Sequence, residues 1–328
     1  MDFKMKKTVY LATLSLMGLG IFTSAIKYNK AYADSINGVS VENNQNNTNS
    51  NSENNNDNGE NNNSDENNAD QYKYDVTSAR DKYMMKIANG TSYLWAEPYK
   101  PGAKYLGSTN RINGLSVQLN QKAVSNKETY YQISRKGHVY GWINAKALKS
   151  ISTYVLPYTY SSQLYPTLAP NACEAISLKM ALSVKGSANN LSTRTFIDRM
   201  PRSSNIHKGF RGNPYKHNAT NVSWTILPAP LTRYGKQYNS NTANISSYHK
   251  DQIIKEVKRG NAVAFAGSRN MRGKATGHML TIVGYRYGQF LVADPYKYAG
   301  DGNKIFWVST SRFQQVYDQY NRYAVVVR

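Results

Sequence analysis

The sequence predicts an α+β domain preceded by a small all-β barrel, and three observations lead to this fold class. Residues 71–150 contain short segments of β-forming residues with Gly, Pro and Asn between them. Residues 151–328 open with an apolar helical segment, and most strand-like segments of this part follow it. A helix that comes before a run of strands favours an α+β arrangement.

The N-terminal segment, residues 1–33, has the order of a secretory signal peptide. Basic residues precede an apolar stretch from Val9 to about Ile26, and Ala31-Tyr32-Ala33 then gives the small-x-small pattern of a cleavage site. We therefore expect export and cleavage after Ala33, with no stable membrane insertion afterwards. An uncleaved membrane anchor is the alternative, because the apolar stretch approaches spanning length.

Residues 34–70 are expected to be a disordered linker. From about residue 42 the segment consists almost entirely of Asn, Asp, Glu, Ser and Gly. Such a composition buries too little apolar surface to offset the entropy lost on ordering. The linker is expected to let the folded parts range through a cell wall.

Residues 71–150 are expected to form the barrel, with strands at 92–95, 116–119 and 130–133. Its motifs are Leu94-Trp95-x-x-Pro98-Tyr99-x-Pro101-Gly102-Ala103, Tyr130-Tyr131-Gln132-Ile133 and Gly141-Trp142-Ile143-x-x-x-Ala147-Leu148. This pattern resembles the GW modules, bacterial Src-homology-3-like barrels of wall enzymes. The resemblance implies binding of wall polymers and not of polyproline peptides. Trp142 and Tyr131 are also expected as core residues.

Residues 151–328 are predicted to form the second domain. Helices are expected at 172–184, 251–259 and 311–320, and strands at 262–266, 278–285, 290–294 and 323–327. Residues 185–247 form a polar insertion rich in Pro and Asn, of the kind that lines a cleft as long loops. The aromatic residues of the insertion are expected to pack within it, with substrate binding as the alternative: Phe210, Tyr215, Trp224 and Tyr234.

The net charge is strongly positive. The 41 basic and 20 acidic residues give +21 at pH 7, and residues 71–328 alone carry +25, because nine acidic but only five basic residues come earlier. Such a surface concentrates near polyanions. For an exported protein these are teichoic acids, lipoteichoic acids and anionic lipid, so we expect no nucleic-acid partner. A charge that serves solubility alone is the other interpretation.

Cys173 is the only cysteine of the chain. A single cysteine rules out an intrachain disulfide, a zinc site built on several thiolates and an iron–sulfur cluster. We expect neither a cofactor nor a metal. A lone cysteine is ordinarily a small residue of the core, but Cys173 opens a predicted helix. Unpaired N–H groups and a partial positive charge at that place favour a reactive thiolate.

A thiol nucleophile needs a histidine beside it, and a third group that orients the histidine. Of five histidines, only His278 begins an apolar strand, and Asp294 ends the next strand. We therefore expect Cys173 as nucleophile, His278 as base and Asp294 as orienter. The backbone N–H of Cys173 and the side-chain amide of Gln163 are the candidate oxyanion donors.

The residues around these positions form several motifs. They are Val155 and Tyr158 with Gln163, Asn171-Ala172-Cys173-Glu174-Ala175-x-Ser177-Leu178, Phe196-Ile197-Asp198-x-Met200-Pro201, Gly209-Phe210-x-Gly212-Asn213-Pro214, Gly277-His278-x-x-x-x-Val283-Gly284-Tyr285, Val292-x-Asp294-Pro295 and Trp307-Val308-Ser309-x-x-x-Phe313. This set resembles the bacteriocin-leader type of cysteine peptidases, and more closely their stand-alone secreted branch. The resemblance implies a papain-like fold and thiol hydrolysis of a peptide or isopeptide bond.

The expected substrate is a peptidoglycan stem or bridge peptide or a surface protein, acted on by a secreted, wall-associated enzyme. Two other functions stay open. One is a binding protein on an inactive peptidase scaffold. The other is a transglutaminase-like acyl transferase, which also uses the order Cys, His, Asp and differs in that an amine outcompetes water.

The hairpin that joins His278 to Asp294 gives a geometric prediction. A two-residue turn at Tyr287-Gly288 pairs residues whose numbers sum to 575, which places Asp294 on the face opposite His278. A three-residue loop with Gly288 left-handed gives 574 and a common face. We therefore expect the sum 574, or a compensating bulge, and a hydrogen bond between Asp294 and His278.

Overall fold

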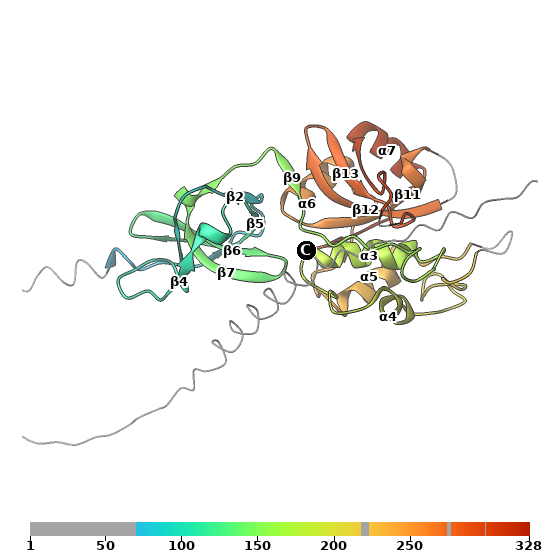
Figure 1. Cartoon of the computed structure of the whole chain (residues 1–328), viewed down its shortest axis with the longest axis horizontal. Coiled ribbons are helices and arrows are strands. Elements are labelled where there is room, and N and C mark those ends of the chain that lie inside the picture. The colour runs from blue at the N-terminus through green and yellow to red at the C-terminus, as the bar shows by residue number, and fades with distance from the viewer. Residues whose placement is uncertain (1–69, 218–222, 274–276, 299) are drawn as a thin grey trace, which may run out of the picture. The chain divides into compact units, whose positions relative to one another are not determined.

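The structure is a computed structural model that describes residues 70–217, 223–273, 277–298 and 300–328 (Figure 1). The predicted signal peptide, residues 1–33, lies outside these ranges, and so does the predicted linker apart from residue 70. No helix within the described ranges combines the length and the apolar character that a membrane span needs.

The first described part is an antiparallel β-sheet barrel. Its strands are β1 Thr77–Ser78, β2 Met85–Ile87, β3 Tyr93–Trp95, β4 Tyr105–Ser108, β5 Ser116–Ser125, β6 Glu128–Arg135, β7 His138–Asn144 and β8 Leu148–Lys149. Two short 3-10 helices accompany them, η1 Thr109–Arg111 and η2 Ala145–Ala147. The sheet order is β4-β3-β7-β6-β5-β2-β8, with β1 paired to β5. This confirms the all-β prediction for this part.

The Gly-Trp pair of β7 has a clear structural reason. Trp142 is buried and pairs with Trp95 of β3 across the sheet. Gly141 has φ +115°, and a Cβ at this position would lie 2.6 Å from the backbone oxygen of Trp95. Only glycine therefore lets β7 approach β3 so closely. The prediction that Trp142 is a core residue is confirmed.

The second part combines helices with an antiparallel sheet. Its helices are α3 Cys173–Ser183, α4 Thr193–Asp198, α5 Pro228–Lys236, α6 Lys250–Lys258 and α7 Thr310–Asp318, with the 3-10 helix η3 Arg269–Met271. Its strands are β9 Thr153–Val155, β10 Ala243–Asn244, β11 Ala262–Ser268, β12 Gly277–Arg286, β13 Gln289–Ala293, β14 Ile305–Ser309 and β15 Ala324–Val327. The sheet order is β10-β15-β11-β12-β13-β14, and β9 pairs with β12. The α+β prediction is confirmed.

Helix α3 is the central element of this part. Every residue from Glu174 to Ser183 is buried, which explains why the sequence shows no polar face at helical spacing. Figure 1 shows α3 together with α4 and α5, and strands β11, β12 and β13 with α7 on the other side of it. Helix α3 therefore lies between a helical half and a sheet half of the domain.

The insertion at 185–247 contains more regular structure than the sequence indicates. Interpreting it as long loops was incomplete, because α4, α5 and β10 all lie within it. The Ser192 side chain caps α4 by accepting from Thr195 N, and Pro228 begins α5, where a proline costs no hydrogen bond. Tyr234 of α5 is fully buried and packs 4.9 Å, ring to ring, from Phe196 of α4.

A β-bulge in the hairpin β12–β13 changes the strand register between the turn and His278. Near the turn, Arg286 pairs with Gln289 and Tyr285 with Phe290, so the residue numbers sum to 575. Beyond a β-bulge between Ile282 and Gly284, the sum becomes 574. The three-residue loop is thus wrong and the compensating bulge is confirmed. The bulge returns the end of β13 to the face of β12 that carries His278.

Candidate active site

The site is a cavity of about 560 Å³ at the N-terminus of α3. Cys173 and Glu174 from α3 line it, together with His278 at the start of β12. Residues 223–228 of the insertion and the segment just before β15 supply much of its wall. Two of the residues expected from sequence, Cys173 and His278, therefore share one cavity.

His278 and Asp294 form a buried pair. His278 Nε2 lies 2.6 Å from Asp294 Oδ1, and both residues are buried. The predicted hydrogen bond between them is confirmed. Burial opposes ionisation of Asp294, but the hydrogen bond and the charge of His278 outweigh it and hold the pKa of the carboxyl below its usual value. The backbone N–H of Tyr296 also donates to Oδ1, at 2.8 Å.

Two buried hydroxyls join α3 to β12. Ser177 Oγ donates to the backbone oxygen of Met279 at 2.9 Å, and Thr281 Oγ1 donates to the backbone oxygen of Ser177 at 2.9 Å. Met279 follows His278 directly, and Ser177 lies about one turn after Cys173. This reciprocal pair therefore fixes the helix of the cysteine against the strand of the histidine. The sequence motif contains Ser177, but nothing in the spacing shows its partner.

Cys173 occupies the first position of α3, where its backbone N–H has no carbonyl of an earlier helical turn to bond. The side chain is half-buried and donates to Glu174 Oε2 at 3.2 Å. Desolvation raises the pKa of the thiol well above its usual value, and the charge of Glu174 and this hydrogen bond raise it further. The helix start alone favours a thiolate, but burial and the carboxylate next to the thiol act in the opposite direction on its pKa.

Gln163 lies beside the site without reaching the cavity. The residue is fully buried, and its Nε2 donates to the backbone oxygens of Ala169 at 3.3 Å and Pro170 at 2.8 Å. Both amide hydrogens thus hold the turn that leads into α3. The role of Gln163 as an oxyanion donor stays a prediction, since its N–H groups have other partners in this structure.

A cation and an aromatic ring stand next to the histidine at the cavity. The Tyr296 ring meets the His278 ring edge to face, with centroids 6.1 Å apart. The guanidinium of Arg269 lies 3.6 Å from the centroid of the Tyr296 ring. Both residues line the cavity, and no motif in the sequence singles out either of them.

The insertion contributes aromatic residues to both the core and the cavity. Phe210 and Tyr234 are buried, which agrees with packing as their role. Trp224 lines the cavity and lies directly against Gly212, where a Cβ would meet the indole ring at 2.2 Å. Tyr215 donates a hydrogen bond to Asp198 at the surface of α4. Substrate binding by Trp224 thus stays open.

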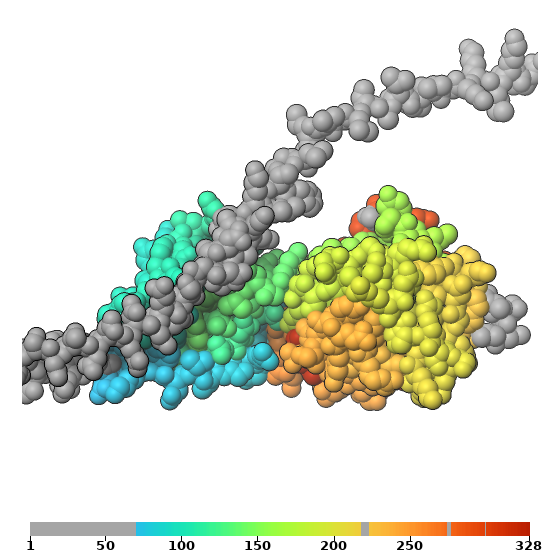
Figure 2. Space-filling model, turned by 90° about the horizontal axis from the view of Figure 1, so that it is seen from below, coloured from blue at the N-terminus to red at the C-terminus, as the bar shows by residue number. Residues whose placement is uncertain are grey.

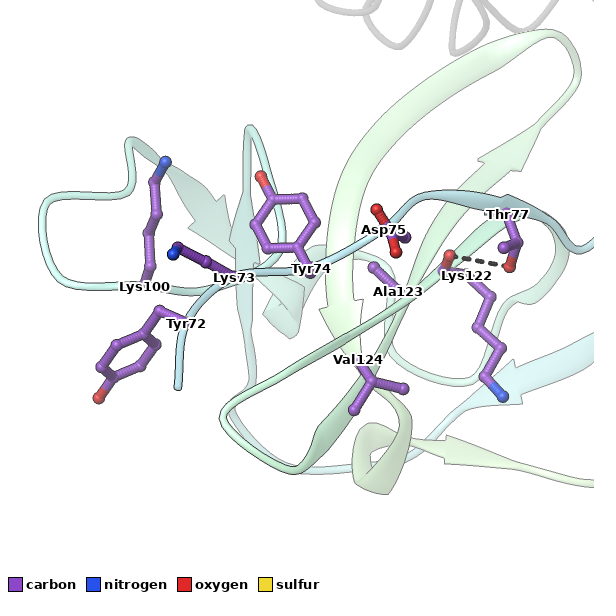
Figure 3. Close-up of a pocket in the computed structure, with 9 residues that line it drawn as sticks. All are labelled: Tyr72, Lys73, Tyr74, Asp75, Thr77, Lys100, Lys122, Ala123 and Val124. Carbon is purple, nitrogen blue, oxygen red and sulfur yellow. Dashed lines mark hydrogen bonds between the residues drawn. The ribbon is translucent and has the colours of Figure 1, made fainter. Parts of the chain in front are cut away.

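No metal is indicated within the described ranges, where no three His, Cys, Asp or Glu side chains gather as a possible ligand set. The barrel has a cavity of its own, of about 1040 Å³ (Figure 3). Three lysines line it, and Lys73 and Lys100 each pair with a carboxylate close by in sequence. Lys122, the third, has no ion-pair partner in the part of the chain that the structure describes.

The order of a β-barrel and an α+β domain with Cys173 and His278 in one cavity defines a papain-like cysteine peptidase fold with an accessory module. The chain belongs to the Peptidase C39 like family, whose pattern matches residues 155–325. The GW (Gly-Tryp) dipeptide domain matches residues 75–149. The resemblances drawn from the sequence are thereby confirmed.

Two solved structures are similar to this chain. A protein described as a C39-like peptidase from Bacillus anthracis is 18% identical, with a TM-score of 0.46 over 54% of this chain and 98% of that chain. A protein described as an autolysin from Listeria monocytogenes is 24% identical, with a TM-score of 0.21 over 28% of this chain and 44% of that chain. No curated protein sequence matches this chain closely enough to count as a relative.

Proposed function

We propose that the chain is a secreted, wall-associated cysteine peptidase that hydrolyses a peptide or isopeptide bond through an acyl-enzyme. Cys173 is the nucleophile, His278 the general base and acid, and Asp294 the orienter. The single observation that carries this proposal is the buried hydrogen bond between His278 and Asp294 beside the cavity that holds Cys173. Membership of a peptidase family supports it.

The orientation of His278 supports this division of roles. Its Nε2 bonds to Asp294, so the ring presents Nδ1 as the nitrogen for the thiol. In the proposed reaction, Nδ1 takes the thiol proton as sulfur attacks the carbonyl carbon of the substrate. The same nitrogen then returns the proton to the leaving amine. Water afterwards cleaves the thioester, with His278 again as base.

The tetrahedral intermediate needs a donor for its oxyanion. The backbone N–H of Cys173 suits this role, because it stands at the start of α3 and adjoins the carbon that sulfur attacks. Gln163 is the second donor only if its amide leaves the oxygens of Ala169 and Pro170. In this proposal the helix start therefore supplies both the nucleophile and one oxyanion donor.

The barrel is proposed to hold the enzyme on the cell wall. Its support is the GW domain match and the positive charge of residues 71–328. The lysine-lined cavity of the barrel suits a polyanion such as teichoic acid. The substrate is then a peptide of the wall or a surface protein near it.

Reaction of the full chain with purified sacculi and with a peptide library in H₂¹⁸O tests the proposal. Hydrolysis places one ¹⁸O atom in each new carboxylate, which mass spectrometry detects. Products that instead carry an added amine identify the transglutaminase-like transferase. Binding to sacculi without any new carboxylate in either the sacculi or the peptide library identifies an inactive scaffold.

A further inference from the structure

Glu174 is a carboxylate buried inside the cavity, directly beside Cys173. Only 6% of its surface is exposed, and Thr225 Oγ1 donates to its Oε1 at 2.6 Å. Its Oε2 accepts from the thiol of Cys173. Across the described ranges, no basic side chain forms an ion pair with it.

A carboxylate costs free energy at such a place, because burial removes its hydration and no cation replaces the water. Burial accordingly raises the pKa of Glu174, although the hydrogen bond from Thr225 and nearby backbone N–H groups work against this. Packing alone gives no reason for an acid here, since most of the following residues of α3 belong to the apolar core. The contacts of Glu174 instead point to the thiol.

The hydrogen bond between Cys173 and Glu174 opposes transfer of the thiol proton to His278. A thiol that donates to a carboxylate keeps its proton, and the negative charge disfavours a thiolate beside it. Within the described ranges, the thiol bonds to Glu174 and not to His278. This contact therefore favours the protonated thiol over the reactive thiolate.

We propose that Glu174 is a positioning residue that holds Cys173 as a thiol directed away from His278 until an N–H group of the substrate replaces the thiol as donor to the carboxylate. The inference rests on the proposed function, and it names a feature of the substrate. That feature is a backbone amide or amine close to the scissile carbonyl. Cleavage then starts only in a filled cavity.

Replacing the thiol by a substrate N–H keeps the number of hydrogen bonds to Glu174 unchanged. The thiol leaves Oε2 and turns toward Nδ1 of His278, and the substrate N–H takes the vacated acceptor. The thiol has two arrangements, one bonded to Glu174 and one turned toward His278. Substrate that binds the second more tightly shifts the population toward it, so no further energy source is needed. The proton of the thiol then moves to His278 as sulfur attacks.

Other titratable and charged groups line the same cavity as the thiol. They are His278 on β12, Arg269 on η3 and the tyrosines Tyr296, Tyr320 and Tyr323. Backbone N–H groups of Glu174 and Met279 lower the pKa of Cys173, but they weigh less than Glu174 and desolvation. Among the groups that raise the pKa of Cys173, Glu174 is the carboxylate. Its removal is therefore the most direct intervention.

The test is the rate of alkylation of the full chain by iodoacetamide from pH 5 to pH 10, without substrate. Cys173 is the only cysteine, so no other thiol contributes to the rate. Because the pKa of the wild-type thiol is raised, the rate continues to increase beyond pH 9. Glu174→Gln keeps the shape and removes the charge, and we expect at least about tenfold faster alkylation at pH 7. Thr225→Val keeps the carboxylate next to the thiol and serves as the comparison, and its midpoint should stay closer to that of the wild type than the midpoint of Glu174→Gln.

An unchanged or higher midpoint in Glu174→Gln overturns the proposal. If that variant does not fold, Glu174→Asp replaces it, because the shorter side chain withdraws the carboxylate from the thiol. An intermediate midpoint is then expected, and a wild-type midpoint contradicts the proposal. Since alkylation needs no substrate, this outcome is separate from hydrolysis, on which the proposed function depends.

Discussion

His278 and Asp294 form the best-defined contact of the site, and their geometry decides what each substitution at 294 should do. Asp294 Oδ1 accepts from both His278 Nε2 and the backbone N–H of Tyr296. An asparagine at 294 would keep its oxygen in this place, because the N–H of Tyr296 selects the oxygen and not the amino group. Asparagine thus preserves the ring orientation and loses only the charge.

We expect Asp294→Ala to lower kcat by about 10²-fold and Asp294→Asn by only about tenfold, since the ring keeps its tautomer in the second variant. Steady-state kinetics on one peptide substrate checks this order. Circular dichroism spectra of both variants serve as the folding control. Equal losses in the two variants would mean that orientation of the ring is not the role of Asp294.

At the residue scale, the sequence identifies the candidate catalytic residues better than it identifies the hydrogen-bond partners of their side chains. Cys173, His278 and Asp294 can be selected because each stands at the end of a predictable element. Glu174 and Gln163 behave differently, since the roles of their side chains depend on which donor or acceptor lies nearby in three dimensions. Burial and the contact with Glu174 together raise the pKa of the Cys173 thiol, and Gln163 bonds to Ala169 and Pro170. No spacing in the chain reveals either contact.

At the scale of elements, the pairing of α3 with β12 sets the distance between nucleophile and base. Ser177→Ala removes the donor to Met279, and we expect it to lower the free energy of unfolding by about 1–2 kcal/mol and to lower kcat as well. Ser183→Ala is the control, because its hydroxyl is also buried on α3 but donates to Met180 and accepts from the backbone N–H of Thr159, with no bond to β12. A similar loss of stability without loss of kcat is expected there. Denaturation and kinetics together give both quantities.

The hairpin β12–β13 shows what side-chain alternation and turn length can predict about strand register. Parity along the two strands shows that an uninterrupted register with a two-residue turn fails to bring Asp294 to His278, and the bulge between Ile282 and Gly284 supplies the missing residue. The sequence shows that the strand register must change along the hairpin, but it does not show at which residue the bulge lies. The position depends on packing, because Gly284 lies close to the backbone of Tyr154 in β9.

The Gly-Trp pair of the barrel gives a second prediction at this scale. A Cβ at Gly141 would meet the oxygen of Trp95 at 2.6 Å, whereas Gly107 also has a positive φ but nothing within 4 Å of a Cβ. Gly107→Ala therefore costs backbone strain alone, about 1 kcal/mol. Gly141→Ala should cost at least about 2 kcal/mol more, since the steric clash adds to the strain. Comparing the melting curves of the two variants tests this difference, and equal shifts would contradict it.

The insertion at 185–247 resisted prediction for a physical reason. Its polar, Pro- and Asn-rich composition hides α4 and α5, which are short helices of 6 and 9 residues. Such helices gain little from intrinsic propensity and depend on tertiary packing. Here the packing comes from buried aromatic residues such as Phe196 and Tyr234.

At the scale of the whole molecule, charge is the property that the proposed wall association depends on. Binding of the full chain, carrying Cys173→Ala to prevent cleavage, should weaken as salt rises through roughly 0.5 M. Lys122→Glu changes a charge inside the barrel cavity, and Lys149→Glu makes the same change at an exposed position of β8. We expect the first to weaken binding to teichoic-acid-bearing walls more than the second, as measured by pelleting. Equal binding to walls stripped of teichoic acid would indicate peptidoglycan as the ligand.

The division of the chain into a barrel and a peptidase domain was predictable from composition and motifs. The barrel shows in its turn residues and in Gly141-Trp142, and the peptidase domain shows in Cys173 and His278. What the sequence could not supply is the state of the site, which depends on the contacts of Cys173 in the folded cavity.

The central claim is that Cys173 and His278 act together on a peptide bond, and product release from purified sacculi tests it most directly. Soluble peptides are measured by mass spectrometry after incubation with the wild type, Cys173→Ala and His278→Ala, each shown to be folded. The account predicts release by the wild type and none by either variant above the enzyme-free background. Release by Cys173→Ala at the wild-type rate would contradict it.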